Sequence, residues 1–134
     1  MESRFQFVHL TSGILAFLVF LASGIYMRMI FPDVYSENES IRFLFRANHI
    51  YILFSALLNV SLGMYVTGSV LPPLKLMHQS GSLLVALSPI LFVIAFLVEP
   101  LQASPSRPLT IIGVFATTVG LGLHVFTFFW KRKP

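Results

Sequence analysis

The sequence has no cysteine and few charged residues. Charged side chains make up 10% of its 134 residues, whereas soluble globular domains carry about 25%, so a soluble globular protein is excluded. Disordered chains are poor in apolar residues, and this chain is 56% hydrophobic, which excludes disorder too. Without cysteine, disulfide frameworks, thiolate metal sites and cysteine catalysis are also excluded.

Long apolar runs are what the sequence does contain. All charged residues lie outside the four runs 5–27, 47–74, 76–98 and 108–130, and each run reaches the about 20 residues that a membrane-crossing helix needs. The first is longer than the apolar part of a signal peptide, so we expect a membrane helix there. Barrel strands would alternate polar and apolar residues, and only helices otherwise satisfy the backbone in lipid.

These runs predict an all-α fold, an integral membrane four-helix bundle with up-down-up-down topology. We expect one domain over residues 1–134, with helices at about 5–30, 37–68, 74–98 and 108–130. Pro32 is expected to end the first helix, and Ser36 to cap the second with Glu39 reaching back as a capping box. Pro89 is expected to kink the third and free a backbone carbonyl.

Basic residues predict the orientation of the bundle. With four spans, both termini and the second loop share one side, which carries five Lys/Arg residues against four on the other. The cluster Lys131–Lys133 lies at the C-terminus. Both termini are therefore expected to be cytoplasmic.

Small and polar residues recur at helical spacing on one face of three helices. Close backbone approach holds membrane helices together, so we expect these faces to meet inside the bundle, and most Leu, Ile and Phe to face lipid. The three sets are His9, Gly13, Ala16, Phe20 and Ser23; Ser55, Asn59 and Gly63; and Gly113, Thr117, Gly120 and His124.

Each expected helix carries one of the four histidines. A titratable residue inside a membrane span is a candidate functional residue. At 1.5 Å per residue, His9, His78 and His124 all fall within about 10 Å of the cytoplasmic ends of their spans, whereas His49 falls near the opposite surface.

The three converging histidines predict a site for haem b or a metal ion, because neutral imidazole binds haem iron and transition metals. Helices one and three are diagonal in an antiparallel bundle, so His9 and His78 would bracket the iron, with His124 as an alternative ligand. Three glycines would leave room for the ring, and three basic residues would pair with its propionates: Gly13, Gly81 and Gly120, and Arg4, Lys75 and Lys131. The layout resembles the architecture of haem b four-helix membrane proteins, which implies a redox or assembly factor.

Two alternatives stand beside this prediction. The histidines would be packing residues in a structural or accessory subunit without a cofactor, which contacts the lipid bilayer and another membrane protein or itself. A second metal site would use Met27, Met29 and His49, since thioether and imidazole suit Cu(I).

Other chemistry has little support in the sequence. Arg42, Arg46 and His49 form a basic stripe that would bind an anionic headgroup or a quinone-like carbonyl, or pair with nearby carboxylates. No catalytic motif for a hydrolase is present. Nucleic-acid binding is not expected, because the net charge of +4 is spread over membrane-flanking positions.

Several short segments, spread over most of the chain, resemble a known family. The sequence is similar to a family of short, functionally uncharacterised bacterial inner-membrane proteins at Arg46–Tyr51, Leu57–Asn59, Gly63 and Glu99–Pro100. The resemblance implies a bacterial inner membrane and directs attention to Arg46, Asn48, His49 and Asn59.

Overall fold

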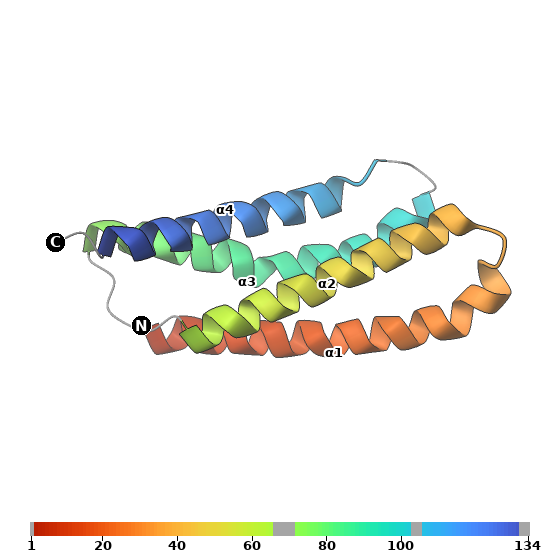
Figure 1. Cartoon of the computed structure of the whole chain (residues 1–134), viewed down its shortest axis with the longest axis horizontal. Coiled ribbons are helices and arrows are strands. Elements are labelled where there is room, and N and C mark those ends of the chain that lie inside the picture. Colours follow the sequence, from red (N-terminus) through yellow and green to blue (C-terminus); the bar gives the residue numbers. More distant parts are fainter. Residues whose placement is uncertain (1, 66–71, 103–105, 132–134) are drawn as a thin grey trace.

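The computed structural model describes residues 2–65, 72–102 and 106–131. All regular elements in these residues are helical: α1 (Glu2–Val34), α2 (Glu39–Tyr65), α3 (Lys75–Val98) and α4 (Pro108–Lys131), with the short 3-10 helices η1 (Pro72–Leu74) and η2 (Glu99–Gln102). Four helices are long and apolar enough to cross a membrane, which confirms the predicted all-α, four-helix class. Successive helices run in opposite directions (Figure 1). We call the end where α1 begins and α4 finishes the terminal end, and the opposite end, where α2 and α4 begin, the distal end.

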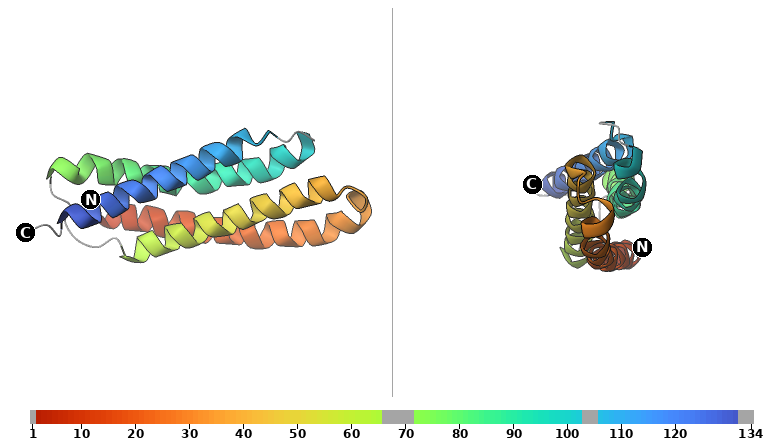
Figure 2. Two further views of the ribbon diagram at one scale, coloured as in Figure 1. Left: turned by 45° about the horizontal axis from the view of Figure 1, so that its top comes forward. Right: turned by 90° about the vertical axis from the view of Figure 1, so that its right-hand side faces the viewer.

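The bundle consists of two helical hairpins. Helix α1 packs along α2, α3 packs along α4, and α3 also contacts both helices of the first hairpin (Figure 2). The prediction that α1 and α3 are diagonal is therefore wrong. Small residues let α1 and α3 approach closely. The Ser12 hydroxyl of α1 donates a hydrogen bond of 2.8 Å to the Ala86 carbonyl of α3.

Helix α1 does not end at Pro32. It continues to Val34, because a proline in the last turn removes one hydrogen bond there without breaking the turns before it. The connection then closes through a hydrogen bond of 3.3 Å from the Tyr35 amide to the Phe31 carbonyl.

The predicted capping box at the start of α2 is also wrong. Asn38, not Ser36, caps the helix: its Oδ1 accepts a hydrogen bond of 3.1 Å from the Ile41 amide, as asparagine commonly does at this position. The helix therefore begins at Glu39, two residues later than expected. The expected end of this helix near residue 68 lies outside the described residues.

The interior differs between the two ends of the bundle. The small-residue faces are buried as predicted, except that Phe20 is only partly buried. Phe45, Phe92 and Phe96 are also buried, in a cluster with Ile52. Phe45 and Phe96 meet edge to face with ring centroids 5.1 Å apart, a favourable aromatic arrangement. Towards the terminal end, glycine, serine, asparagine and histidine make up much of the interior, and the candidate site lies there.

Candidate functional site

The structure brings together the three histidines singled out in the sequence. His124 of α4 lies edge to face with both other rings, with centroids 6.1 Å from His9 of α1 and 4.7 Å from His78 of α3. His9 is fully buried, His124 is 9% exposed and His78 is half-buried. We call these three side chains the histidine cluster.

A hydrogen bond to Asn59 of α2 determines which ring nitrogen of His9 carries a proton. The Asn59 amide nitrogen donates to the carbonyls of Ser55 at 2.9 Å and Val85 at 3.0 Å, so its oxygen faces His9. That oxygen lies 2.8 Å from Nδ1 of His9. Because an amide oxygen only accepts, His9 must carry its proton on Nδ1.

A buried charge without a partner is costly, so the fully buried His9 ring is neutral, and its Nε2 has a lone pair instead of a proton. This atom is buried and has no hydrogen-bond partner among the described residues. An unpaired buried polar atom costs about 1 to 3 kcal/mol.

Pro89 is the source of this arrangement. It lies inside α3 and lacks the amide that would otherwise bond the Val85 carbonyl. The freed carbonyl accepts from Asn59 and also from the Ser88 hydroxyl, at 2.9 Å. The prediction that Pro89 frees a carbonyl is confirmed, and this carbonyl holds the amide that orients His9.

His124 is held from α3. One of its ring nitrogens, Nε2, lies 3.2 Å from the Ser82 hydroxyl. The backbones of α3 and α4 are in contact beside it, since a Cβ placed on Gly81 would lie 2.9 Å from the Gly120 carbonyl oxygen. Ser82 was not among the residues expected at the site.

The cluster does not fit a haem. The prediction that glycines leave room for a porphyrin is wrong. A Cβ on Gly13 would lie 2.7 Å from Val60. The space beside Gly81 is occupied by α4, and the space beside Gly120 is occupied by α3. The rings of His78 and His124 also contact one another directly, which leaves no space for a porphyrin between them.

Nor is a site with three ligands already formed. Across the described ranges 2–65, 72–102 and 106–131, no three side chains from His, Asp and Glu are arranged to hold a metal ion. The cluster instead offers one oriented imidazole, His9, with a second ring 6.1 Å from it.

His49 lies apart from the cluster. Its Nδ1 is 2.8 Å from the Ser23 hydroxyl, and its ring stacks on Phe20 with centroids 4.1 Å apart. Met27 packs against the aromatic core, whereas Met29 is 68% exposed. The structure does not bring both thioethers to His49.

A second polar cluster, which sequence reasoning did not anticipate as a unit, lies at the distal end. Glu99 of η2 is 1% exposed; it accepts from the Thr110 amide at 2.9 Å and hydroxyl at 2.5 Å, and lies 3.6 Å from Nε of Arg107. Asn48 of α2 accepts from Arg107, and its Oδ1 lies 3.0 Å from the Thr110 hydroxyl oxygen, whose single proton goes to Glu99. Its amide donates to the Ala95 carbonyl at 2.9 Å. These contacts join the α3–α4 connection to α2.

The basic stripe on α2 is divided. Arg42 donates to the Ser36 carbonyl at 3.4 Å and lies over the Phe31 ring, and Arg46 is exposed. Within the described part of the chain, the ion pair found is Arg107–Glu99, so the expected pairing of the stripe with nearby carboxylates is not seen there.

Comparisons of the chain with models of protein families, with curated proteins and with solved structures found no match. Function is therefore inferred from the side chains and their contacts.

Proposed function

We propose that the chain is an integral protein of a bacterial inner membrane, with both termini cytoplasmic, and that it binds a copper ion as Cu(I) at the histidine cluster. The observation that carries this proposal is the buried, unpartnered Nε2 lone pair of His9.

The hydrogen bond between His9 and Asn59 supports a metal ligand. Metal-binding histidines usually donate their other ring nitrogen to an oxygen, which fixes the tautomer and the ring orientation. His9 has this arrangement, since its Nδ1 lies 2.8 Å from the Asn59 oxygen.

His124 is the second ligand in this proposal. Metal–imidazole bonds are about 2.0 Å long, so two rings on opposite sides of one ion have centroids about 6 Å apart, and those of His9 and His124 are 6.1 Å apart. Cu(I) accepts as few as two ligands. His78 is half-buried and its ring lies against His124, so in this proposal it is the candidate third ligand.

The charge of the site favours a monovalent ion. The ligands are neutral imidazoles and the site lies within apolar spans, so the desolvation cost is smaller for Cu(I) than for a divalent ion. Imidazole is among the ligands that bind copper.

Titration of the purified protein with Cu(I) under anaerobic conditions, against a chromophoric chelator, tests the proposal. We expect one ion per chain. His9→Gln and His124→Gln each remove binding, and Asn59→Leu weakens it about 10- to 100-fold, as loss of an orienting partner does. His49→Gln is the matched control, because His49 also bonds a side chain of a neighbouring helix but is distant from the cluster. Wild-type protein that binds no Cu(I), or equal loss in His49→Gln, contradicts the proposal.

A second function has its own supporting observation. Three histidines each hydrogen-bond a residue of a neighbouring helix: His9 with Asn59, His49 with Ser23 and His124 with Ser82. Side chains of this kind join helices in membranes, as they would in an accessory subunit that packs against another membrane protein or a second copy. That function is favoured if the protein purifies free of metal with a partner and its histidine variants lose stability.

A further inference from the structure

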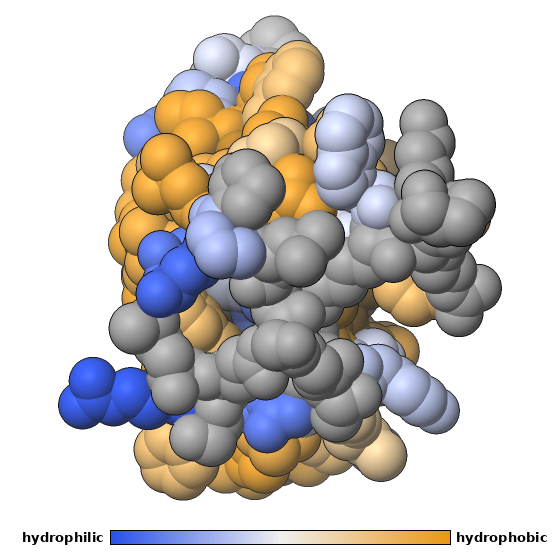
Figure 3. Space-filling view, turned by 90° about the vertical axis from the view of Figure 1, so that its left-hand side faces the viewer, coloured by the Kyte–Doolittle hydropathy of each residue, from blue (hydrophilic) through white to orange (hydrophobic). Residues whose placement is uncertain are grey.

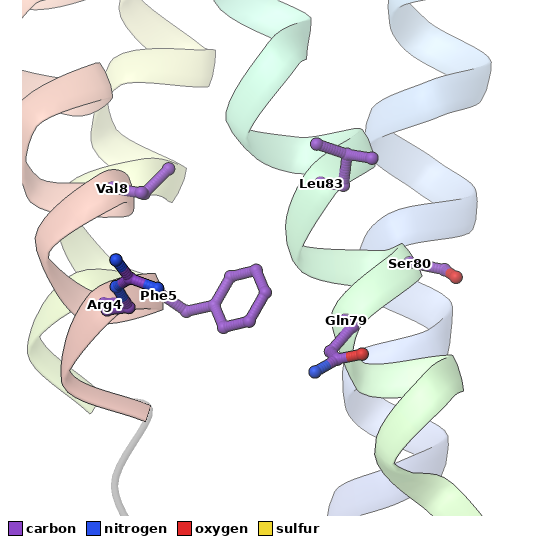
Figure 4. A pocket seen from close by; sticks show the side chains of 6 residues that line it. All are labelled: Arg4, Phe5, Val8, Gln79, Ser80 and Leu83. Atoms are coloured by element: carbon purple, nitrogen blue, oxygen red, sulfur yellow. The ribbon is translucent and has the colours of Figure 1, made fainter. Parts of the chain in front are cut away.

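A groove lies between α1 and α3 at the terminal end, outside the histidine cluster. Its volume is about 550 Å³, and it is lined by Arg4, Phe5 and Val8 of α1 and by Gln79, Ser80 and Leu83 of α3. Phe5 extends from α1 towards α3 across this space (Figure 4).

The lining changes from polar to apolar along the groove. Helices α1 and α3 both begin at the terminal end, so Arg4 and Gln79 lie at the outer edge. Val8 and Leu83 lie one helical turn deeper. A phospholipid at a membrane interface has the same polarity, with its headgroup outermost and its chains inside.

The mouth of the groove is cationic. Arg4 is exposed, and exposed Lys75 lies four residues before Gln79, hence one turn further out on the same face of α3. Of the five acidic residues, four lie towards the distal end: Asp33, Glu37, Glu39 and Glu99. The fifth, Glu2, is the first residue of α1, and Arg4 and Lys75 outnumber it at this end. Figure 3 views the terminal end directly, where hydrophilic side chains lie among hydrophobic ones.

We propose that this groove binds one anionic phospholipid. The phosphate lies between Arg4 and Lys75, and one acyl chain lies along Phe5, Val8 and Leu83. A zwitterionic lipid of the same chain length fills the apolar part equally well but brings a cation to the two basic residues, so the site selects lipids by headgroup charge.

Native mass spectrometry tests this proposal. Wild-type protein is equilibrated in mild detergent with equal amounts of phosphatidylglycerol and phosphatidylcholine that carry identical chains. We expect one bound phosphatidylglycerol in preference to phosphatidylcholine. Each basic side chain near an anionic headgroup contributes about fivefold in binding, so Arg4→Gln and Lys75→Gln should each reduce the preference about fivefold.

Two matched controls separate this groove from general effects of charge and shape. Arg46→Gln removes an exposed arginine from the distal half and should leave the preference unchanged. Leu83→Trp fills the groove and should reduce binding of both lipids, whereas Ile112→Trp, at an exposed position on α4, should not.

Three results would overturn the proposal. They are equal retention of the two lipids by wild-type protein, an equal effect of Arg46→Gln and Arg4→Gln, and displacement of the lipid by millimolar glycerol 3-phosphate. The last result would identify a site for a soluble phosphate. Copper is absent from these measurements, so their outcome does not depend on the function proposed for the histidine cluster.

Discussion

Glu99 is a buried carboxylate whose partners come from two parts of the chain. It is 1% exposed, accepts hydrogen bonds from Thr110 and from Asn48 of α2, and lies in an ion pair with Arg107. Loss of one partner of a buried ion pair leaves the other charge uncompensated, at a cost of about 3 to 5 kcal/mol. We therefore expect Glu99→Ala to lower the free energy of unfolding by about 3 kcal/mol, measured by titration with dodecyl sulfate in mild detergent and followed by circular dichroism.

A double-variant cycle distinguishes the ion pair from simple loss of packing. Arg107→Ala alone should also destabilise, and Glu99→Ala/Arg107→Ala should cost less than the sum of the two single changes, because neither charge is then left alone. Glu37→Ala, at an exposed position, should change stability by less than about 0.5 kcal/mol. If the losses in the free energy of unfolding from the two single substitutions simply add in the double variant, Glu99 and Arg107 do not stabilise each other.

At single residues, the sequence predicted positions better than partners. Helical spacing placed His9, Asn59 and His124 on inward faces, and the structure buries all three. The distal cluster escaped prediction, because Thr110 is separated by 62 residues from Asn48. Only the packed fold brings them together. The one feature of the sequence that could have indicated this cluster is that Glu99 directly follows an apolar span.

At the scale of helices, α3 and α4 depend on contact between their backbones. A Cβ on Gly120 would lie 2.6 Å from Cγ2 of Val85 and 2.8 Å from the Gly81 carbonyl oxygen. These distances require the helices to separate, and overpacking of this kind costs about 1 to 3 kcal/mol. We expect Gly120→Ala to lower the thermal unfolding midpoint in detergent and to weaken Cu(I) binding, because His124 follows on the same face one turn later.

The same helix provides the control. A Cβ on Gly122 would meet nothing within 4 Å, so Gly122→Ala should leave the midpoint unchanged or raise it, since alanine favours helix by about 1 kcal/mol over glycine. Equal effects of the two substitutions would mean that backbone contact does not hold this helix pair.

Helix ends were harder to predict than helix faces. Ser36 and Glu39 match the capping-box pattern, but Asn38 lies nearer to the first helical turn and its side chain caps it. Pro32 signals a helix end, yet α1 continues for two more residues. Both differences arise because several residues near a terminus can satisfy the same few backbone groups.

At the scale of the whole molecule, the distribution of basic residues predicts an orientation for the bundle. The start of α1, the end of α4 and the start of α3 lie at the terminal end (Figure 1). By sequence, the segments on that side carry five Lys/Arg residues against four on the other. The cytoplasmic side retains the larger number of basic residues. We therefore expect the terminal end to be cytoplasmic and the connection between α1 and α2 to be periplasmic.

Because the chain has no cysteine, a single introduced cysteine is the only thiol of this protein that a maleimide can label, and its labelling reports the orientation. In spheroplasts, a membrane-impermeant maleimide should label Glu37→Cys at once, and Lys75→Cys only after the membrane is opened. Both positions are exposed, so a difference in labelling reflects the side of the membrane. The reverse pattern would invert the orientation. Labelling of both positions in intact spheroplasts would mean that the narrow charge difference inserts the bundle in both directions.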